Sequence, residues 1–314
     1  MTDLLSLTNR PSKELFFQQN DPNDVRLGEI VPNNSYQDSS VIILGCPQDE
    51  GIARNNGRLG AKFAPNKIRE QFYKLTDFGI SKRIFDLGDT IIQNTLEETH
   101  EIQNQIVKQI LQDGKRAIIL GGGNDLAYPN GRAMAEVFGR ENWIAINIDG
   151  HFDVRKSEYP HHETPYRQLL EEKLIQPNYF YEAGFQTQAN SPVYYEYLQN
   201  LGVNLVSLEQ LRSQETADEQ LRNMVKQEFI HHSSSLSTFF GFDLNVVRAA
   251  DAPGTTETSP IGLRAGEFLQ IVKYAGSLVN TKLIQFTEVN PNFDVDDITA
   301  KLVAIAMHRF CSRN

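Results

Sequence analysis

Short apolar runs recur along the chain, and most of them end at glycine or at a polar residue. We predict β-strands at residues 41–44, 84–87, 117–120, 143–148, 179–183, 203–208, 237–242 and 283–289. Because these runs are apolar at consecutive positions, both faces of each strand should be buried. Strands of this kind occur mainly in parallel sheets that helices cover on both sides.

Helical patterns lie between the apolar runs. We predict helices at residues 65–75, 96–113, 126–138, 165–174, 191–201, 217–231, 265–279 and 294–309. This alternation predicts the α/β class, with an open, doubly wound, mainly parallel sheet of eight strands and helices on both faces. A closed barrel of eight strands is the alternative, and the length of several loops favours the open sheet.

The regular part of the chain is not divided by a linker. The sequence has 314 residues, and no stretch rich in Gly, Ser or Pro interrupts it after the first strand. We therefore expect a single domain at residues 40–314, preceded by a polar, irregular arm at residues 1–39.

Composition and charge narrow the class of function. The chain has 30 Lys and Arg against 40 Asp and Glu, a formal net charge of −10. This argues against binding to nucleic acid or to an anionic membrane. Two cysteines are too few for a disulfide framework, and residues 1–21 do not resemble a signal peptide. We expect a cytoplasmic protein without a membrane helix.

Candidate metal ligands follow the fourth predicted strand. Ligands of open parallel sheets bind beyond the carboxyl ends of the strands. Asp149, His151 and Asp153 come directly after this strand, and in an extended segment their side chains would face the same way. Two carboxylates and an imidazole at one point suit a divalent ion such as Mn²⁺ or Zn²⁺. A solvated polar loop is the alternative.

Further polar residues follow three other strands. Asn124 lies in the glycine-rich turn after the third strand, and Asp243 and Asn245 share a face after the seventh. Glu288 stands at the end of the eighth strand. Each of these alone is also consistent with an ordinary cap or turn. Together they crowd carboxylates at one edge of the sheet, where a bound cation is the simplest way to offset their repulsion.

These motifs resemble the ureohydrolase family, which includes arginase, agmatinase, guanidinobutyrase and formimidoylglutamase. The matching stretches are residues 121–125, 149–155, 243–245, 252–255 and 288–291, with Thr299 and Ala300. The resemblance covers the chain from about Val41 onward. It implies an arginase-like sheet, a two-manganese site and homo-oligomers, commonly trimers or hexamers.

The resemblance also implies roles for the candidate residues. Asp149 and Asp243 would bridge two metal ions, with Asp153 as a ligand of the first and His151 as a ligand of the second. Glu288 would hold the amidine or guanidine group of the substrate. The implied reaction is metal-assisted hydrolysis by a water whose pKa the two cations lower, with Asp153 taking the remaining proton.

The resemblance extends to a proton shuttle and to the substrate. His162 matches the histidine of the family that moves protons, with the adjacent His161 or a solvated loop as alternatives. Arg155 would bind a substrate carboxylate, and a surface pair with Glu158 is the alternative. The pattern His-Phe-Asp-x-Arg followed by Thr-Pro-aromatic is most similar to formimidoylglutamase. N-formimidoyl-L-glutamate is therefore the expected substrate, and guanidinobutyrate and arginine stay open.

Two positions depart from the family pattern. Asn124 stands where the family has a His ligand of the first metal, and Asn245 where it has an Asp ligand of the second. A neutral amide oxygen is a weaker ligand, so we expect a weakened site for one or two Mn²⁺ ions, Mg²⁺ or another divalent ion. One hypothesis is an active hydrolase. The other is an impaired relative that binds a ligand or regulates, as a homo-oligomer or beside an active relative.

Other ionisable residues have ordinary explanations. The pair His231 and His232 ends a predicted helix, where positive charge suits the helix dipole. Asp294, Asp296 and Asp297 are expected to open the last helix, where negative charge suits it.

Overall fold

The computed structural model describes residues 4–213, 219, 223 and 236–313. Within these residues one sheet has the strand order β1-β3-β2-β4-β9-β8-β5-β6-β7. The strands are β1 (Thr8–Asn9), β2 (Val41–Gly45), β3 (Ile84–Thr90), β4 (Arg116–Leu120), β5 (Trp143–Ile148), β6 (Phe180–Phe185), β7 (Asn204–Ser207), β8 (Ser237–Asp243) and β9 (Thr281–Thr287).

The pairing confirms the predicted parallel sheet. All neighbouring strands from β3 to β7 run parallel. The sheet is open, with β1 and β7 at its edges, so the barrel alternative is wrong. The prediction of eight strands missed β1, which pairs antiparallel with β3. A strand of two residues has no apolar run and leaves no periodic signal in the sequence.

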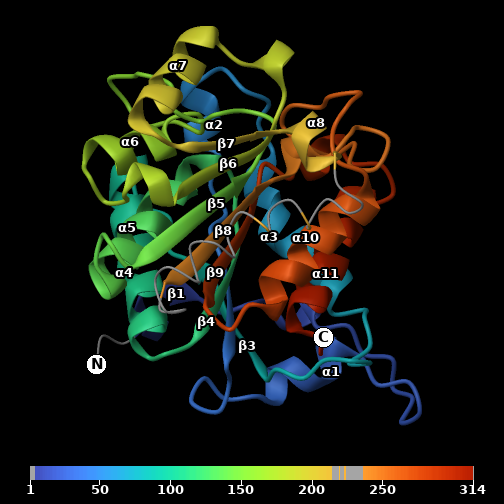
Figure 1. Ribbon diagram of the computed structural model, residues 1–314. Coiled ribbons are helices and arrows are strands. Elements are labelled where there is room, and N and C mark those ends of the chain that lie inside the picture. Colours follow the sequence, from blue (N-terminus) through green and yellow to red (C-terminus); the bar gives the residue numbers. More distant parts are fainter. Residues whose placement is uncertain (1–3, 214–218, 220–222, 224–235, 314) are drawn as a thin grey trace.

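Helices cover both faces of the sheet. They are α1 (Leu27–Ile30), α2 (Glu50–Arg54), α3 (Ala64–Phe72), α4 (Leu96–Gln112), α5 (Ala127–Phe138), α6 (Pro165–Glu171), α7 (Pro192–Leu201), α8 (Leu208–Leu211), α10 (Ala265–Ser277) and α11 (Ile298–Cys311). Figure 1 shows α4, α5 and α6 on one side and α3, α10 and α11 on the other. The helix predicted at 217–231, except for residues 219 and 223, and the pair His231 and His232 lie outside the described residues.

The last helix begins later than predicted. Asp296 and Asp297 have φ values of +50° and +55°, in the left-handed region, so α11 starts only at Ile298. Asp294 lies before the helix and accepts hydrogen bonds from two backbone N–H groups of its first turn, at 3.0 and 3.1 Å. The predicted start at Asp294 was therefore wrong, whereas Asp297 is the N-cap residue of the helix and Asp294 satisfies two of its free N–H groups.

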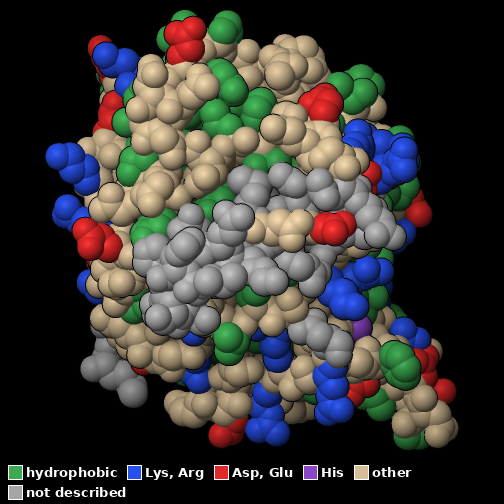
Figure 2. Space-filling model, in the orientation of Figure 1, with side chains coloured by type: hydrophobic (Ala, Val, Ile, Leu, Met, Phe, Trp, Pro, Cys, Tyr) green, Lys and Arg blue, Asp and Glu red, His purple; other side chains and the backbone are tan. Residues whose placement is uncertain are grey.

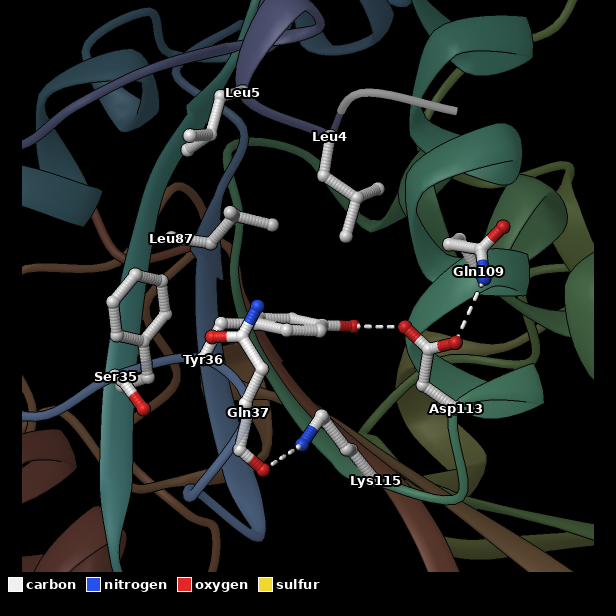
Figure 3. A pocket seen from close by; sticks show the side chains of 10 residues that line it. Leu4, Leu5, Ser35, Tyr36, Gln37, Leu87, Gln109, Asp113 and Lys115 are labelled. Atoms are coloured by element: carbon white, nitrogen blue, oxygen red, sulfur yellow. Dashed lines mark hydrogen bonds between the residues drawn. The ribbon is translucent and has the colours of Figure 1, made fainter. Parts of the chain in front are cut away.

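The N-terminal arm packs against the sheet and lines, with β3 and α4, a half-open cavity of about 660 Å³ (Figure 3). Polar groups around this cavity are paired with one another. The Tyr36 hydroxyl donates to Asp113 at 2.7 Å, and Lys115 Nζ donates to the Gln37 carbonyl at 3.1 Å. Lys115 directly precedes β4. The cavity therefore borders the amino end of this strand, at the sheet edge opposite the candidate ligands.

A buried ion pair joins α3 to β3. Arg69 donates to both carboxylate oxygens of Asp86, at 2.8 and 3.1 Å, and to Asp89 at 2.6 Å. Burial opposes the charge of Arg69, but the two carboxylates outweigh this effect and raise its pKa. Removing one partner of such a pair leaves an uncompensated buried charge.

The surface carries charges of both signs. Figure 2 shows Lys, Arg, Asp and Glu side chains mostly around the margin of one face. Among the described residues, no helix has the length and apolar character that crossing a membrane requires.

Candidate metal centre

The candidate ligands meet because four strands are neighbours at the centre of the sheet. These strands, β4, β9, β8 and β5, are parallel, so their carboxyl ends lie at one edge. Asn124, Glu288 and Asp149 follow three of them closely, and Asp243 ends the fourth. Segments far apart in sequence thus bring polar side chains to one place, as the sequence predicts.

Three carboxylates form a buried cluster. Single carboxylate oxygens of Asp149, Asp153 and Asp243 lie within 4.8 Å of one another. Burial raises the pKa of Asp153 and of Asp243 well above the ordinary value, and the neighbouring Asp149 adds to both shifts. We refer to these three residues as the carboxylate cluster. Its crowded negative charge is the electrostatic setting that a divalent cation would stabilise.

Two residues at this edge have unusual backbone conformations. Asp153 has a φ of +49° and Glu288 a φ of +64°, both in the left-handed region. Such conformations are uncommon for residues other than glycine and cost of order 1 kcal/mol or more. The sequence suggested that the segment beginning at Asp149 is extended. The positive φ of Asp153 shows that it is not. A backbone turn at Asp153, instead of simple alternation, brings its carboxylate into the cluster.

His151 lies directly beside Asp149. Its backbone N–H donates to Asp149 Oδ1 at 2.9 Å, and its ring Nδ1 lies 3.5 Å from the same oxygen. Burial opposes the charged ring, but the hydrogen bond and charge of Asp149 outweigh it and raise the pKa of His151 to about 10. The metal-free imidazole is therefore protonated at pH 7 and must lose this proton before it can bind a metal.

The Glu288 carboxylate is fully buried and held in place by three donors. It accepts from the Asn124 backbone N–H at 2.7 Å and from the Thr256 hydroxyl, and it lies 3.3 Å from His162 Nδ1. The other ring nitrogen of His162 contacts Asn55 at 3.0 Å. Burial opposes the charge of His162, but Glu288 outweighs it and raises the pKa to about 9.

The adjacent His161 has the opposite character. Burial, with the neighbouring charge of His162, lowers the pKa of His161 to about 4. Its Nδ1 accepts from the Glu163 backbone N–H at 3.2 Å. His161 is therefore neutral at pH 7, and of the two histidines the structure places His162 beside Glu288.

Asn124 presents a donor to the carboxylate cluster. Its Nδ2 donates to Asp153 Oδ2 at 2.6 Å, and its Oδ1 accepts from Gln285 Nε2 and from the Thr287 hydroxyl, both at 2.9 Å. An amide nitrogen does not bind a metal as a neutral donor group. In this orientation the side chain does not act as the ligand that the resemblance implies.

Asn245 is also engaged by neighbouring groups. Its backbone N–H donates to Asp243 Oδ1 at 2.7 Å, and its side-chain oxygen accepts from the Glu257 backbone N–H at 2.9 Å. The Thr256 hydroxyl lies 3.4 Å from the same oxygen. The structure therefore places Asn245 next to a member of the cluster, with its amide oriented by the loop that follows β8.

Arg155 lies near this site with its side chain half exposed. Its Nε forms an ion pair with Glu163 at 2.5 Å. The alternative expected from the sequence, a surface ion pair between Arg155 and Glu158, is therefore wrong, because the partner is Glu163. Because Glu163 directly follows His162, the ion pair holds Arg155 against the segment that carries His162.

Comparison with known proteins identifies the family. The model of the arginase family matches residues 39–312. The chain belongs to the arginase family. The formimidoylglutamase of Staphylococcus haemolyticus (strain JCSC1435) is 30% identical over 274 residues, which cover 87% of this chain and 86% of that protein. Membership confirms the resemblance read from the sequence, and with it a hydrolase family whose formimidoylglutamase members act on C–N bonds in linear amidines.

Solved structures of arginase-family proteins share the fold. Trypanosoma cruzi formiminoglutamase with Mn²⁺ is similar with a TM-score of 0.83 at 29% identity, covering 92% of this chain and 98% of that one. The formimidoylglutamase of Bacillus subtilis subsp. subtilis str. 168 has a TM-score of 0.84 at 26% identity, covering 94% and 93%. These likenesses confirm the predicted α/β architecture.

The donor set fits a divalent ion in part. The carboxylate cluster and His151 supply the hard oxygen and imidazole ligands that suit Mn²⁺. Asn124, in contrast, directs an amide nitrogen at this arginase-family site.

Several supporting residues were not found from the sequence. Asn147 in β5 donates to both oxygens of Glu182 in β6, at 3.1 and 3.3 Å, and to Asp149 at 3.4 Å. Glu182 is fully buried, and this burial raises its pKa. Gln285 in β9 supports Asn124. Asn147 and Glu182 interrupt otherwise apolar strands, and Gln285 interrupts the apolar run at the centre of β9; such interruptions are a signal that sequence reading could have used.

Proposed function

We propose that this chain hydrolyses a C–N bond of a linear amidine that carries carboxylates, such as N-formimidoyl-L-glutamate, to give L-glutamate and formamide. The observation that carries the proposal is the carboxylate cluster next to the separately buried Glu288. Asn124 connects the two, because its backbone N–H contacts Glu288 and its side chain contacts Asp153. The names of the similar proteins support the choice of substrate.

The cluster is the proposed metal site. Asp149, Asp153, Asp243 and His151 would hold one or two divalent ions, of which Mn²⁺ is supported by the T. cruzi structure. When bound, such ions lower the pKa of water and stabilise negative charge that develops on the reacting group.

The protein groups bind the amidine and move protons. Glu288 keeps a fixed orientation through its three donors, so its carboxylate can bind the amidinium of the substrate in one geometry. Asp153 takes a proton from the attacking water. His162, protonated at pH 7 because of Glu288, donates a proton to the leaving amine.

Arg155 is the proposed contact for a substrate carboxylate. Its side chain is half exposed, and its closest approach to Glu163 is through Nε. A guanidinium can bind a carboxylate through two parallel N–H groups. We propose that the remaining nitrogens bind the acidic end of the substrate beside the His162 segment.

Turnover by the purified 314-residue chain tests the proposal. With millimolar Mn²⁺ present, we expect formamide and L-glutamate from N-formimidoyl-L-glutamate, and much slower hydrolysis of L-arginine and 4-guanidinobutyrate. Light scattering of the same sample tests the predicted trimer or hexamer.

The second candidate is a non-catalytic relative that binds a ligand or a partner subunit. The orientation of Asn124 favours it, because that side chain offers no ligand atom to a metal. Elemental analysis after incubation with Mn²⁺ separates the candidates. Protein that retains no metal and hydrolyses no amidine would leave only the second.

A further inference from the structure

The ring of His162 has a polar neighbour at each of its two nitrogens. Its Nδ1 lies 3.3 Å from Glu288 Oε1, and its Nε2 lies 3.0 Å from the side-chain amide of Asn55. Asn55 directly follows α2. A ring turned by 180° would present carbon atoms at both places, so the two contacts are made in only one orientation of the ring. Glu288 and Asn55 together select that orientation.

The backbone around His162 is fastened to α2 as well. The His162 N–H donates to the Gly51 carbonyl at 3.3 Å. Arg54 Nη1 donates to the Pro160 carbonyl at 3.2 Å, and the same guanidinium binds both carboxylate oxygens of Glu97 in α4, at 2.6 and 3.0 Å. The segment that carries the ring therefore rests on α2 and α4, and the contact to Nε2 comes from the residue that ends this support.

The contact with Asn55 determines which ring nitrogen can release a proton. An imidazole that is about to act as an acid carries a proton on both nitrogens. Under the proposed function Glu288 binds the amidinium, so Nδ1 faces the reacting group, whereas Nε2 is covered by Asn55. The proton for the leaving amine must then come from Nδ1, and the proton on Nε2 stays on the ring.

A ring that keeps a proton on Nε2 needs an acceptor beside it. In the structure Asn55 directs Nδ2 toward Nε2, which suits only a ring without a proton at that nitrogen. Turning the side-chain amide by 180° about its last bond brings Oδ1 to the same point. Among the described residues this amide makes no other hydrogen bond, so it can turn without losing a partner. The charged ring therefore requires the oxygen of Asn55.

We propose that Asn55 is a positioning residue, whose amide oxygen accepts from Nε2 of the charged His162 and thereby reserves the Nδ1 proton for the leaving amine. When the C–N bond breaks, its electron pair stays with the amine nitrogen, and this nitrogen takes the proton from Nδ1. The ring is then neutral, with its remaining proton on Nε2 against Asn55. The inference rests on the proposed function, because it assigns a partner to the proposed acid.

Two substitutions of similar size separate an acceptor at this position from a donor. Asn55→Leu removes the hydrogen bond to a charged group, so kcat for N-formimidoyl-L-glutamate should fall about 10- to 100-fold. KM should change less than about threefold, because the contact is not made to substrate. Asn55→Asp keeps only the acceptor, so its kcat should stay within about threefold of that of the unsubstituted enzyme.

The control is Asn204→Leu. Asn204 lies in the edge strand β7, is partly buried, and donates to the Asn178 carbonyl at 2.7 Å. Its loss should change kcat by less than about twofold, because it touches no part of the site. An unchanged kcat with Asn55→Leu, an equal fall in kcat with Asn55→Leu and Asn55→Asp, or a loss confined to KM would overturn the proposal.

Neutron diffraction on the unsubstituted protein at pH 7, without metal or substrate, gives a second test. We expect a deuteron on Nε2 of His162 and none on the atom of Asn55 that faces it. Two deuterons on that atom, opposite a bare Nε2, would refute the proposal. A chain that hydrolyses no amidine would contradict the proposed function, whereas the deuterons would still decide whether Asn55 accepts from His162.

Discussion

The substitution Asp243→Asn should stabilise the metal-free protein and reduce its stabilisation by Mn²⁺. The amide has nearly the same shape, and its oxygen can still accept from the Asn245 backbone N–H at 2.7 Å. The substitution removes one of three carboxylates whose oxygens lie within 4.8 Å of one another. Without a cation, the negative charge of Asp243 destabilises the protein. With a cation, its carboxylate is a proposed ligand, so the substitution should raise the stability of the metal-free protein and lower the stabilisation by metal.

The expected size follows from the distances in the cluster. Two unit charges 4.8 Å apart repel by about 3.5 kcal/mol at an effective dielectric constant of ~20. Because burial and repulsion raise the pKa of Asp153 and Asp243, part of this charge is already neutralised. We expect a gain of about 1–3 kcal/mol without metal, or roughly 2–9 °C in Tm for a chain of this size.

Thermal unfolding in EDTA and in millimolar Mn²⁺ measures both effects. Mn²⁺ at about 100 times its Kd should stabilise the unsubstituted protein by about 2.7 kcal/mol, and the variant should lose most of this gain. The control is Asp86→Asn, which breaks the buried pair with Arg69. It should cost about 3–5 kcal/mol with and without metal. A destabilised Asp243→Asn protein that Mn²⁺ still stabilises fully would refute the reasoning.

Three further predictions concern protons and substrate. Because the pKa of His151 is raised to about 10, Mn²⁺ must displace its proton. The affinity for Mn²⁺ should therefore rise from pH 6 to 9, and calorimetry in buffers of different ionisation enthalpy should detect the released proton. An affinity for Mn²⁺ that does not depend on pH would contradict this prediction. His162→Ala should lower kcat about 100-fold, against a small effect of His161→Ala. In the unsubstituted enzyme kcat should fall as pH rises through about 9, where His162 loses its proton. The charged form of His162 contributes stability that is present in full below its unfolded pKa, and this contribution should be lost as pH rises through the folded pKa. A kcat that stays level past pH 10 would exclude His162 as the acid. Arg155→Ala should raise KM for N-formimidoyl-L-glutamate about 5- to 30-fold, from about 1–2 kcal/mol for a half-exposed charged contact, and leave KM for an uncharged amidine unchanged; equal increases would reject its carboxylate role.

The parts of the site that could be predicted are those that follow from strand order. Asp149, Asp243 and Glu288 stand at or just beyond the ends of apolar runs, and parallel pairing brings such positions to one edge. The resemblance added His162, which the structure places beside Glu288. The strands other than β1, and most helices, were likewise visible as apolar periodicity.

Other features depend on contacts that the local sequence does not contain. The left-handed backbone of Asp153 leaves no signal in the sequence, because aspartate adopts this conformation at only a small share of positions, so the segment reads as extended. Arg155 was matched with the nearer Glu158 by sequence spacing, whereas its partner is Glu163. The orientation of Asn124 requires Gln285, from a strand more than 150 positions away.

The metal-free site is balanced by its own histidines. His151 and His162 are both protonated at pH 7 because each lies against a buried carboxylate, Asp149 and Glu288 respectively. If the cluster holds a divalent ion as proposed, its binding would be an exchange, in which the ion replaces the proton of His151 as the counter-charge. His162 keeps its proton, since its partner Glu288 lies outside the proposed ligand set. Under the proposed function the two histidines would serve different steps: the proton of His151 would be released when metal binds, and that of His162 would be kept for the leaving amine.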